Sequence, residues 1–314
     1  MDHAGPNSSQ IAVALIPARY NSTRLPGKPL LPLGGKPLVL WVAERALAAS
    51  TVSRAIVATD DSRIFDAVRS AGFEARMTRR DHLSGTDRVA EIARDLVAEI
   101  IVNVQGDEPL IEPETIDRAV NALMSDHQAE IATTCEPLEA AADVLSTAVV
   151  KVVIDNEGRA LNFSRAPIPF PVEAVRRHGS IEAALENEPA LLSTFSKHTG
   201  LYVYRREFLQ EFTSWPPSER ERRESLEQLR ALERGVTIRV VPAASSSIGV
   251  DTMEDLERVR SILERGAHGK VKSKKEKKRI SGDYFCLFPF DFLLHGDRLK
   301  IGLDFYEVGR YECW

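Results

Sequence analysis

The chain has 314 residues, enough for one large α/β domain with an inserted or appended piece. Hydrophobic residues make up 43% and charged residues 28%, as in ordinary soluble globular proteins. The formal net charge of −5 argues against general nucleic-acid binding, so any polyanion site has to be built locally. Because no apolar stretch of about 18 residues occurs, we expect no membrane span.

Three cysteines are present, Cys135, Cys286 and Cys313, with no CxxC spacing and no nearby histidine cluster. This pattern argues against a disulfide framework or a zinc site and fits a reducing compartment. The first ten residues are polar, and no secretory signal is visible. We therefore expect a cytoplasmic protein.

In the first half of the chain, strand patterns alternate with helix patterns. The apolar run 11–16 predicts a buried strand ended by Pro17, and a loop rich in proline and glycine follows to about Lys36. We expect further strands at 54–59, 74–78, 99–104 and 130–135, and helices at 37–49, from Ser62 after the cap Asp60-Asp61, at 85–98 and from Pro113. The alternation predicts an α/β fold with a mostly parallel sheet, which binds ligands at the carboxyl ends of its strands.

The second half has a different pattern. Two strands, 148–154 and 159–164, flank the turn Asn156-Glu157-Gly158 and predict a hairpin. We then expect, in chain order, a proline-dense loop at 167–171, a strand at 197–205, a helix at 218–233, a strand at 236–241 and a helix from Thr252 to about Arg265.

Composition changes abruptly near the end of the chain, so we divide it into a domain at 11–266 and an extension at 267–314. Residues 270–279 hold seven basic residues and one acidic residue, and 284–314 hold nine of the 21 aromatic residues. The basic run is either a solvated linker or a patch for an anionic lipid or nucleic acid. The aromatic end either docks on the domain or on a partner, or has no role.

A basic loop follows the first predicted strand. No acidic residue occurs between His3 and Ala43, whereas four basic ones do: Arg19, Arg24, Lys28 and Lys36. Arginine donates paired hydrogen bonds to phosphate and lysine supplies a point charge, so the loop is a candidate phosphate site. The GxxxxGK[ST] pattern is absent, and a solvated basic loop is the alternative.

Two acidic motifs stand at predicted strand ends. In QGDEP (105–109), Asp107 is placed to hold Mg²⁺ beside bound phosphates, or else it belongs to a turn. In GVDT (249–252), Asp251 is either a second metal ligand or the N-cap of the last helix. Two carboxylates from distant parts of the chain suit a Mg²⁺ site that leaves room for substrate oxygens.

Other motifs are ambiguous when taken singly. SGTDR (84–88) begins a helix, where backbone donors either meet a polar ligand or are capped by Ser84 or Thr86. Arg165 at a strand end is able to pair with a carboxylate, and His198 and Tyr202 share one face of a strand. Glu227 and Gln228 lie on a charged helix and are surface residues by default.

Together these motifs resemble the CMP-KDO synthetases, or 3-deoxy-manno-octulosonate cytidylyltransferases. Nine strings match in family order over residues 11 to about 265: IPARYNSTRLPGKPL (16–30), IVATD (56–60), MTRRDHLSGTDR (77–88), IVNVQGDEP (101–109), VKVV (150–153), FSRAPIP (163–169), KHTGLYVYR (197–205), LEQLR (226–230) and GVDTMEDLERVR (249–260). Residues 171–196 match weakly, and the extension lies outside the pattern.

The resemblance implies a Rossmann-like nucleotidyltransferase with a smaller part that forms a homodimer. It implies CTP and the acidic sugar KDO as substrates, Mg²⁺ as cofactor, and CMP-KDO for lipopolysaccharide synthesis as product. The residue roles that it implies are phosphate binding by Arg19, Arg24 and Lys28; nucleotide contact by Ser84, Gly85 and Thr86; a place between nucleotide and sugar for Gln105; Mg²⁺ binding by Asp107 and Asp251; catalysis by Lys28, Asp107 and Asp251; and a sugar site lined by Arg165, His198, Tyr202, Glu227 and Gln228.

Two alternatives stay open at this point. The first is a cytidylyltransferase for a related acidic sugar, such as 8-amino-KDO or a sialic acid. The second is a non-catalytic protein that binds a nucleotide or a partner. Retention of Asp107, Asp251 and Lys28 counts against the second, because binding alone does not require a metal-activated hydroxyl.

Overall fold

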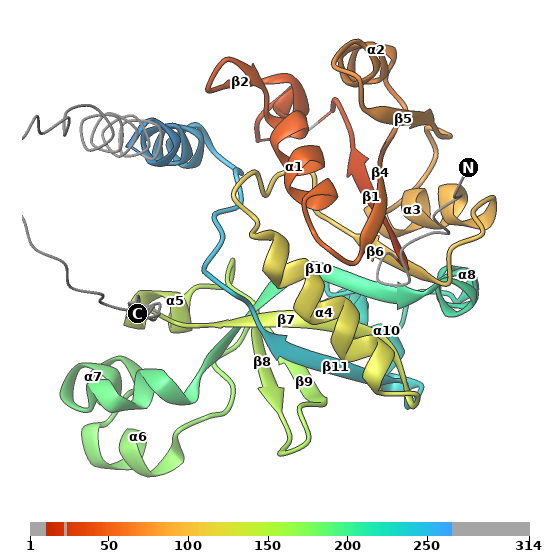
Figure 1. Cartoon of the computed structure of the whole chain (residues 1–314). Coiled ribbons are helices and arrows are strands. Elements are labelled where there is room, and N and C mark those ends of the chain that lie inside the picture. Colours follow the sequence, from red (N-terminus) through yellow and green to blue (C-terminus); the bar gives the residue numbers. More distant parts are fainter. Residues whose placement is uncertain (1–10, 22–23, 266–314) are drawn as a thin grey trace, which may run out of the picture. The chain divides into compact units, whose positions relative to one another are not determined.

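A computed structural model describes residues 11–21 and 24–265 (Figure 1). Nine strands of these residues form one sheet, whose main path has the order β11-β7-β10-β6-β1-β4-β5. β1, β4, β5 and β6 run parallel, β11 runs parallel to β7, and β10 lies antiparallel between β6 and β7. The predicted α/β fold with a mostly parallel sheet is confirmed.

The first half alternates strands and helices as its sequence pattern predicts. Its strands are β1 (Ala12–Ala18), β4 (Val52–Thr59), β5 (Glu74–Met77), β6 (Ile100–Asn103) and β7 (Ala129–Pro137). Its helices are α1 (Leu38–Leu47), α2 (Ser62–Ser70), α3 (Gly85–Arg94) and α4 (Pro113–Ser125). Asp61 caps α2 by accepting a hydrogen bond from Arg63 N, as expected.

The second half contains the predicted hairpin and several helices. Its strands are β8 (Lys151–Ile154), β9 (Ala160–Ser164), β10 (Ser196–Arg205) and β11 (Thr237–Pro242). Its helices are α5 (Ala141–Leu145), α6 (Val172–His178), α7 (Ile181–Asn187), α8 (Arg206–Ser214), α9 (Glu219–Glu224), α10 (Gln228–Glu233) and the helix at 253–265.

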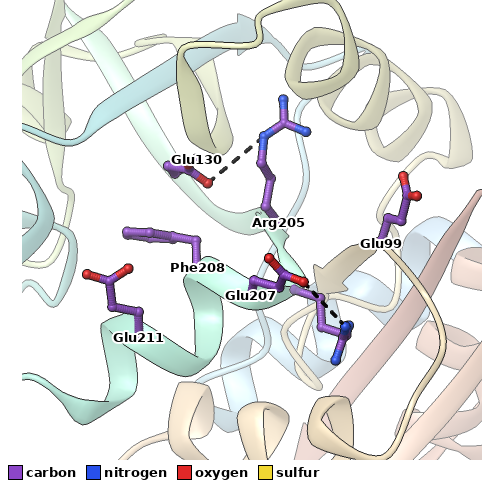
Figure 2. A pocket seen from close by; sticks show the side chains of 7 residues that line it. Glu99, Glu130, Arg205, Glu207, Phe208 and Glu211 are labelled. Carbon is purple, nitrogen blue, oxygen red and sulfur yellow. Dashed lines mark ion pairs between the residues drawn. The ribbon is translucent and has the colours of Figure 1, made fainter.

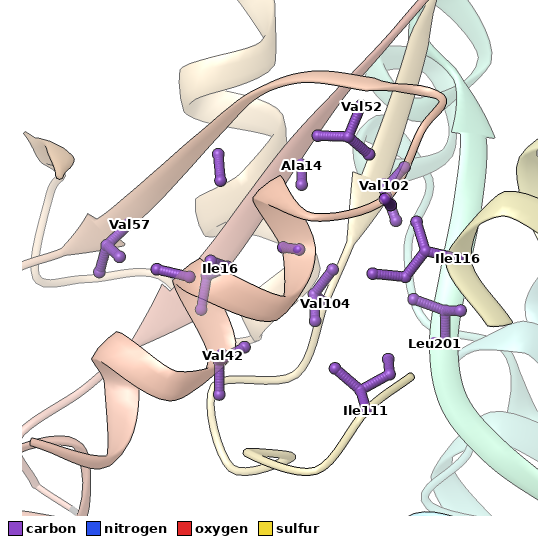
Figure 3. Close-up of a cluster of buried hydrophobic side chains, with 14 of the residues drawn as sticks. Ala14, Ile16, Val42, Val52, Val57, Val102, Val104, Ile111, Ile116 and Leu201 are labelled. Atoms are coloured by element: carbon purple, nitrogen blue, oxygen red, sulfur yellow. The ribbon is translucent and has the colours of Figure 1, made fainter. Parts of the chain in front are cut away.

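Apolar side chains cover both faces of the sheet, because alternate residues of a strand point to opposite faces. Figure 3 shows one face, where Ala14, Ile16, Val102 and Val104 pack with residues such as Val42 and Ile116 from α1 and α4. On the other face, Leu15 and Ile101 pack with residues of α3, α8 and α10. Two buried layers fix the register of β1 and β6, and so fix where the loops after them begin.

A smaller cluster lies under the segment that matches the family weakly. Leu138, Val144, Leu185 and Phe195 form it, between α5, α7 and the chain that leads into β10. Figure 1 shows α6 and α7 beyond β8, away from β1 and β4. These two helices were not predicted, since seven residues give too short a periodic pattern to recognise.

Several predicted bounds were wrong, each for a local reason. β1 continues through Pro17 to Ala18 and stays paired with β4. Pro17 has no backbone N–H, but this is tolerated on the β6 side because β6 pairs with β1 only as far as Leu15. The helix expected at 218–233 is two helices, divided at Ser225, where φ is 53°. β2 (Pro32–Leu33) and β3 (Lys36–Pro37) form a hairpin inside the predicted loop, with Gly34 and Gly35 both at positive φ.

The extension predicted at 267–314 lies outside the described residues, so its role and the division at 266 stay predictions. In the part of the chain that the structure describes, no helix combines the length and apolar character needed to cross a bilayer.

Candidate active site

A cavity of about 240 Å³ lies at the carboxyl ends of β1 and β6, where an open α/β sheet binds ligands. Six predicted site residues line it: Arg19, Lys28, Ser84, Gly85, Gln105 and Asp107. They come from the loops after β1 and β6 and from the start of α3. The structure thus brings together residues up to 88 positions apart in the sequence.

Lys28 joins the two predicted metal ligands. Its Nζ lies 2.7 Å from Oδ2 of Asp107 and 3.1 Å from Oδ1 of Asp251. Burial acts to lower the pKa of Lys28, but the charges and hydrogen bonds of the two aspartates outweigh it, so the pKa is raised. The lysine is therefore a cation at neutral pH, and both aspartate carboxylates contact its ammonium group.

The position of Lys28 depends on the glycine before it. Gly27 has a φ of 70° and its N–H donates to Tyr20 O, which turns the loop into a short 3-10 helix, η1 (Lys28–Leu30). A Cβ on Gly27 would meet the Tyr20 ring at 3.2 Å. Only glycine suits both the positive φ and this contact.

Asp251 is not the N-cap of the last helix. Thr252 Oγ1 accepts from Asp255 N, and the Asp255 carboxylate accepts from the backbone N–H groups of Asp251 and Thr252. The Asp251 carboxylate is left for Lys28 and for Arg24, which lies 3.0 Å away. The capping alternative considered from the sequence is therefore wrong.

The donor set around Lys28 fits a divalent cation. Both ligands are carboxylates, the kind of group that Mg²⁺ prefers, and their oxygens already converge on one cationic nitrogen. Arg19 lines the cavity and Arg24 pairs with Asp251, so both place positive charge where phosphate groups would need it. The charges of these residues would therefore complement a metal ion and phosphate groups.

The start of α3 forms another side of the cavity. Ser84 caps the helix by accepting from Asp87 N, and the Asp87 carboxylate accepts from Ser84 N. A Cβ on Gly85 would lie 3.3 Å from the Pro17 side chain, so the bare glycine keeps α3 close to the end of β1. Thr86 is buried below and contacts Tyr204. Of the three, Ser84 and Gly85 line the cavity and Thr86 does not.

Gln105 connects the cavity with β10. Its Nε2 donates to Gly200 O at 3.2 Å, and Gly200 lies where β10 loses register with β7, between His198 and Tyr202. A Cβ on Gly200 would lie 2.9 Å from Gln105 Cγ, and one on Gly106 would lie 2.6 Å from Pro17 O. Gln105 thus contacts the strand that carries two predicted sugar residues, though its role with ligands stays a prediction.

His198 and Tyr202 share one face of β10, with ring centroids 5.3 Å apart. Burial lowers the pKa of His198 to about 3, so its imidazole is neutral. Thr133 Oγ1 lies 2.9 Å from His198 Nε2 and 2.7 Å from Leu201 O. Since the carbonyl only accepts, Thr133 donates to it and accepts from His198, which places the imidazole proton on Nε2.

The remaining sugar residues lie at the break between α9 and α10. Burial first, then the charges of Tyr204 and Glu227, raise the pKa of Tyr202, so Glu227 acts on this ring. Gln228 is buried, not exposed as its helix suggested, and its Nε2 has no hydrogen-bond partner. A buried unpaired amide is costly, which makes Gln228 a candidate to bind a ligand.

Arg165 is held beside the same break. Its guanidinium donates to the carbonyls of Thr147, Glu224 and Ser225. These bonds occupy three of the five N–H donors of Arg165 and hold its guanidinium group in place. No described contact joins Arg165 to His198 or Tyr202.

Sequence reasoning missed a buried carboxylate, Glu136, that lies near Glu108. Glu136 is 4% exposed and accepts from Lys197 Nζ at 3.1 Å and from Ser247 N at 2.9 Å. Burial, then the charges of Asp107 and Glu136, raise the pKa of Glu108 to about 7. Lys197 and Glu108 belong to matched strings, but no pattern distinguishes Glu136, which the fold alone brings to this place.

A larger cavity, of about 480 Å³, lies at the opposite edge of the sheet, near the start of β6 and the end of β10 (Figure 2). Its labelled lining residues are Glu99, Glu130, Arg205, Glu207, Phe208 and Glu211. Arg205 donates to the carbonyls of Leu123, Asp126 and Ala129. None of the predicted site residues lines this cavity, so volume is a poorer guide than chemistry here.

Comparisons with known proteins show the family of the chain. The family model described as "Cytidylyltransferase" matches residues 13–238. The 3-deoxy-manno-octulosonate cytidylyltransferases of Geobacter sulfurreducens and Trichlorobacter lovleyi are 52% and 49% identical, over 80% and 81% of this chain and 98% and 99% of theirs. The chain belongs to the 3-deoxy-manno-octulosonate cytidylyltransferase family.

A solved structure supports the same assignment. CMP:2-keto-3-deoxy-manno-octonic acid synthetase, in complex with CTP, is 41% identical, with a TM-score of 0.72, over 81% of this chain and 99% of that one. Members of the family are nucleotidyltransferases, and this chain is one. The resemblance stated from the nine sequence strings is confirmed.

Proposed function

We propose that this cytidylyltransferase transfers CMP from CTP to KDO in a Mg²⁺-dependent reaction. The observation that carries the proposal is the convergence of Asp107 and Asp251 on Lys28, next to a cavity lined by Arg19, Ser84 and Gln105. The CTP complex of the 41% identical synthetase and the names of the relatives support the choice of substrates.

In this reaction the anomeric hydroxyl of KDO attacks the α-phosphorus of CTP in line. A P–O bond forms, the bond to the β-phosphate breaks, pyrophosphate leaves and the hydroxyl proton is lost to solvent. The enzyme positions the partners and neutralises charge. Bound Mg²⁺ would lower the pKa of the attacking anomeric hydroxyl and offset the negative charge of the α-phosphate.

The residues of the chain divide these tasks. Asp107 and Asp251 would hold the metal, while Lys28 and the arginines Arg19 and Arg24 would stabilise the leaving pyrophosphate. Ser84 and Gly85 would contact the nucleotide, with Thr86 supporting them from below. Gln105 would lie between nucleotide and sugar.

The acidic sugar would bind along β10 and the α9–α10 break. The two N–H donors of Arg165 that stay free would pair with the sugar carboxylate, which otherwise repels the phosphates. The bare Nδ1 of neutral His198 would accept from a hydroxyl, and Tyr202, Glu227 and Gln228 would surround the sugar. A homodimer, a cytoplasmic location and a place in lipopolysaccharide synthesis belong to the same proposal, from the family resemblance.

Pyrophosphate release tests the proposal, with CTP, Mg²⁺ and KDO, 8-amino-KDO or N-acetylneuraminate supplied separately. We expect release with KDO. Pyrophosphate release only with one of the other two sugars would support the proposed reaction but change its sugar substrate. No release with any of the three contradicts the proposal.

A further inference from the structure

The guanidinium of Arg19 is held by two backbone carbonyls of a single loop. It donates to His82 O at 2.5 Å and to Ser84 O at 3.0 Å. The same side chain lines the cavity that holds Lys28 and Asp107. The place of this phosphate-binding candidate is therefore set by the loop before α3, not by its own strand.

Electrostatics alone would not keep Arg19 there. Arg88 is fully buried in the first turn of α3, where it pairs with Asp60 at 3.1 Å. Burial first lowers the pKa of Arg88, Asp60 opposes this, and the positive charge of Arg19 lowers it further. Arg19 thus lies near a second guanidinium, and fixed acceptors would hold it in place before an anionic ligand arrives. The carbonyls of His82 and Ser84 are those acceptors.

The carbonyl of Ser84 is fixed by its own helix cap, but that of His82 needs another support. Glu91 supplies it from one turn further along α3. Glu91 Oε2 accepts from Arg79 N at 3.2 Å and pairs with His82 Nε2. The His82 side chain is only 6% exposed, so this is not one of the solvated surface pairs that contribute little.

We propose that Glu91 is a positioning residue, which acts through His82 to hold Arg19 ready for the phosphates of the nucleotide. No motif used above includes Glu91, and it does not touch the cavity that holds Arg19. The phosphate part of this inference rests on the proposed function. The contact chain from Glu91 to Arg19 does not.

The experiment compares Glu91→Ala with Glu91→Gln, which keeps an acceptor oxygen. Calorimetry measures CTP binding without sugar. We expect Glu91→Ala to weaken binding about tenfold, and Glu91→Gln, which keeps the acceptor but not the charge, to lose clearly less. Glu114→Ala is the control, because Glu114 pairs only on the surface with Arg118.

A double-mutant cycle separates positioning from general stability. In an Arg19→Ala background, Glu91→Ala should change CTP binding less than twofold, since its route through Arg19 is gone. An equal loss in both backgrounds overturns the proposal, as does wild-type binding by Glu91→Ala. Equal losses in the Gln and Ala variants also overturn it.

A second readout needs no ligand. In nitrogen relaxation measurements, the Arg19 Nε–H group should be rigid in the wild type and in Glu91→Gln, and mobile in Glu91→Ala. A rigid Arg19 in Glu91→Ala overturns the inference even if CTP is not the ligand. Failure of the wild type to bind CTP would instead count against the proposed function.

Discussion

The backbone N–H of Val250 donates to the carbonyl of Asp107 at 2.8 Å. This bond joins the loop after β6 to the segment that precedes the last helix, 143 positions later in the sequence. It brings Asp251, the next residue, to the same side of the sheet as Asp107. The two carboxylates are therefore placed by the backbone, and Lys28 then bridges them.

Replacing either carboxylate should remove metal-dependent activity. We expect Asp107→Asn and Asp251→Asn to lower turnover by on the order of 10² or more, because a neutral amide holds Mg²⁺ poorly. Steady-state pyrophosphate release checks this. Glu173→Gln on α6 is the control, since Glu173 pairs only with exposed Arg176. Near-normal turnover of Asp107→Asn would remove Asp107 from the metal site.

Replacing Lys28, which bridges the two aspartates, should make the thermal stability of the protein depend more on Mg²⁺. In Lys28→Met the two aspartates lose the charge between them and repel one another. We expect a lower melting temperature than the wild type in chelator, and a larger rise on adding Mg²⁺. Thermal melts across a Mg²⁺ series measure both. An equal Mg²⁺ response in the two proteins would contradict a shared site.

A methyl group on Gly200 should disturb Gln105. The added Cβ would lie 2.9 Å from Gln105 Cγ, so the flexible glutamine has to move from its hydrogen bond with Gly200 O. For Gly200→Ala we expect a several-fold loss of activity with little change in melting temperature. Gly249→Ala is the matched control, because a Cβ there meets nothing within 4 Å. Equal activity of both variants would show that Gln105 has no role.

His198 should make stability depend on pH below neutrality. Its folded pKa is lowered to about 3 from an ordinary 6.5, so the unfolded chain binds the extra proton as pH falls between these values. The free energy of unfolding therefore falls in that window. From pH 7 to 5, urea unfolding should show the wild type losing about 2 kcal/mol more than His198→Gln, which keeps a donor for Thr133.

Nitrogen NMR gives an independent check on the same histidine. The single proton of Thr133 goes to Leu201 O, so His198 should be the neutral tautomer with its proton on Nε2. A spectrum that shows the Nδ1–H tautomer, or protonation near pH 6, would contradict the predicted role as an acceptor for a sugar hydroxyl.

The sequence was a good guide where local patterns determine structure. The strand at 99–104 and the motif after it placed Asp107 correctly, because buried apolar runs and strand-end carboxylates are local features. The same holds for the cap of α2 by Asp61. The family strings supplied the other candidate site residues without any knowledge of distances, and the roles of these residues stay predictions.

Tertiary contacts account for what the sequence could not predict. Gln228 appeared to lie on an exposed charged helix, but the break at Ser225 turns it into the core. The burial of Glu136 depends on Lys197 and Ser247, which are 61 and 111 residues away. The support of Arg19 by Glu91 likewise exists only after folding.

The antiparallel strand β10 lies between β6 and β7, which do not pair with each other. During synthesis, the half of the sheet around β1 is complete well before Ser196–Arg205 leave the ribosome, yet β7 has no neighbour through which to join it. Such long-range pairing is slow and leaves strand edges exposed in the meantime. A nascent chain stopped before β10 should therefore hold the β6-β1-β4-β5 part of the sheet and the β8–β9 hairpin, with β7 unpaired and prone to aggregate.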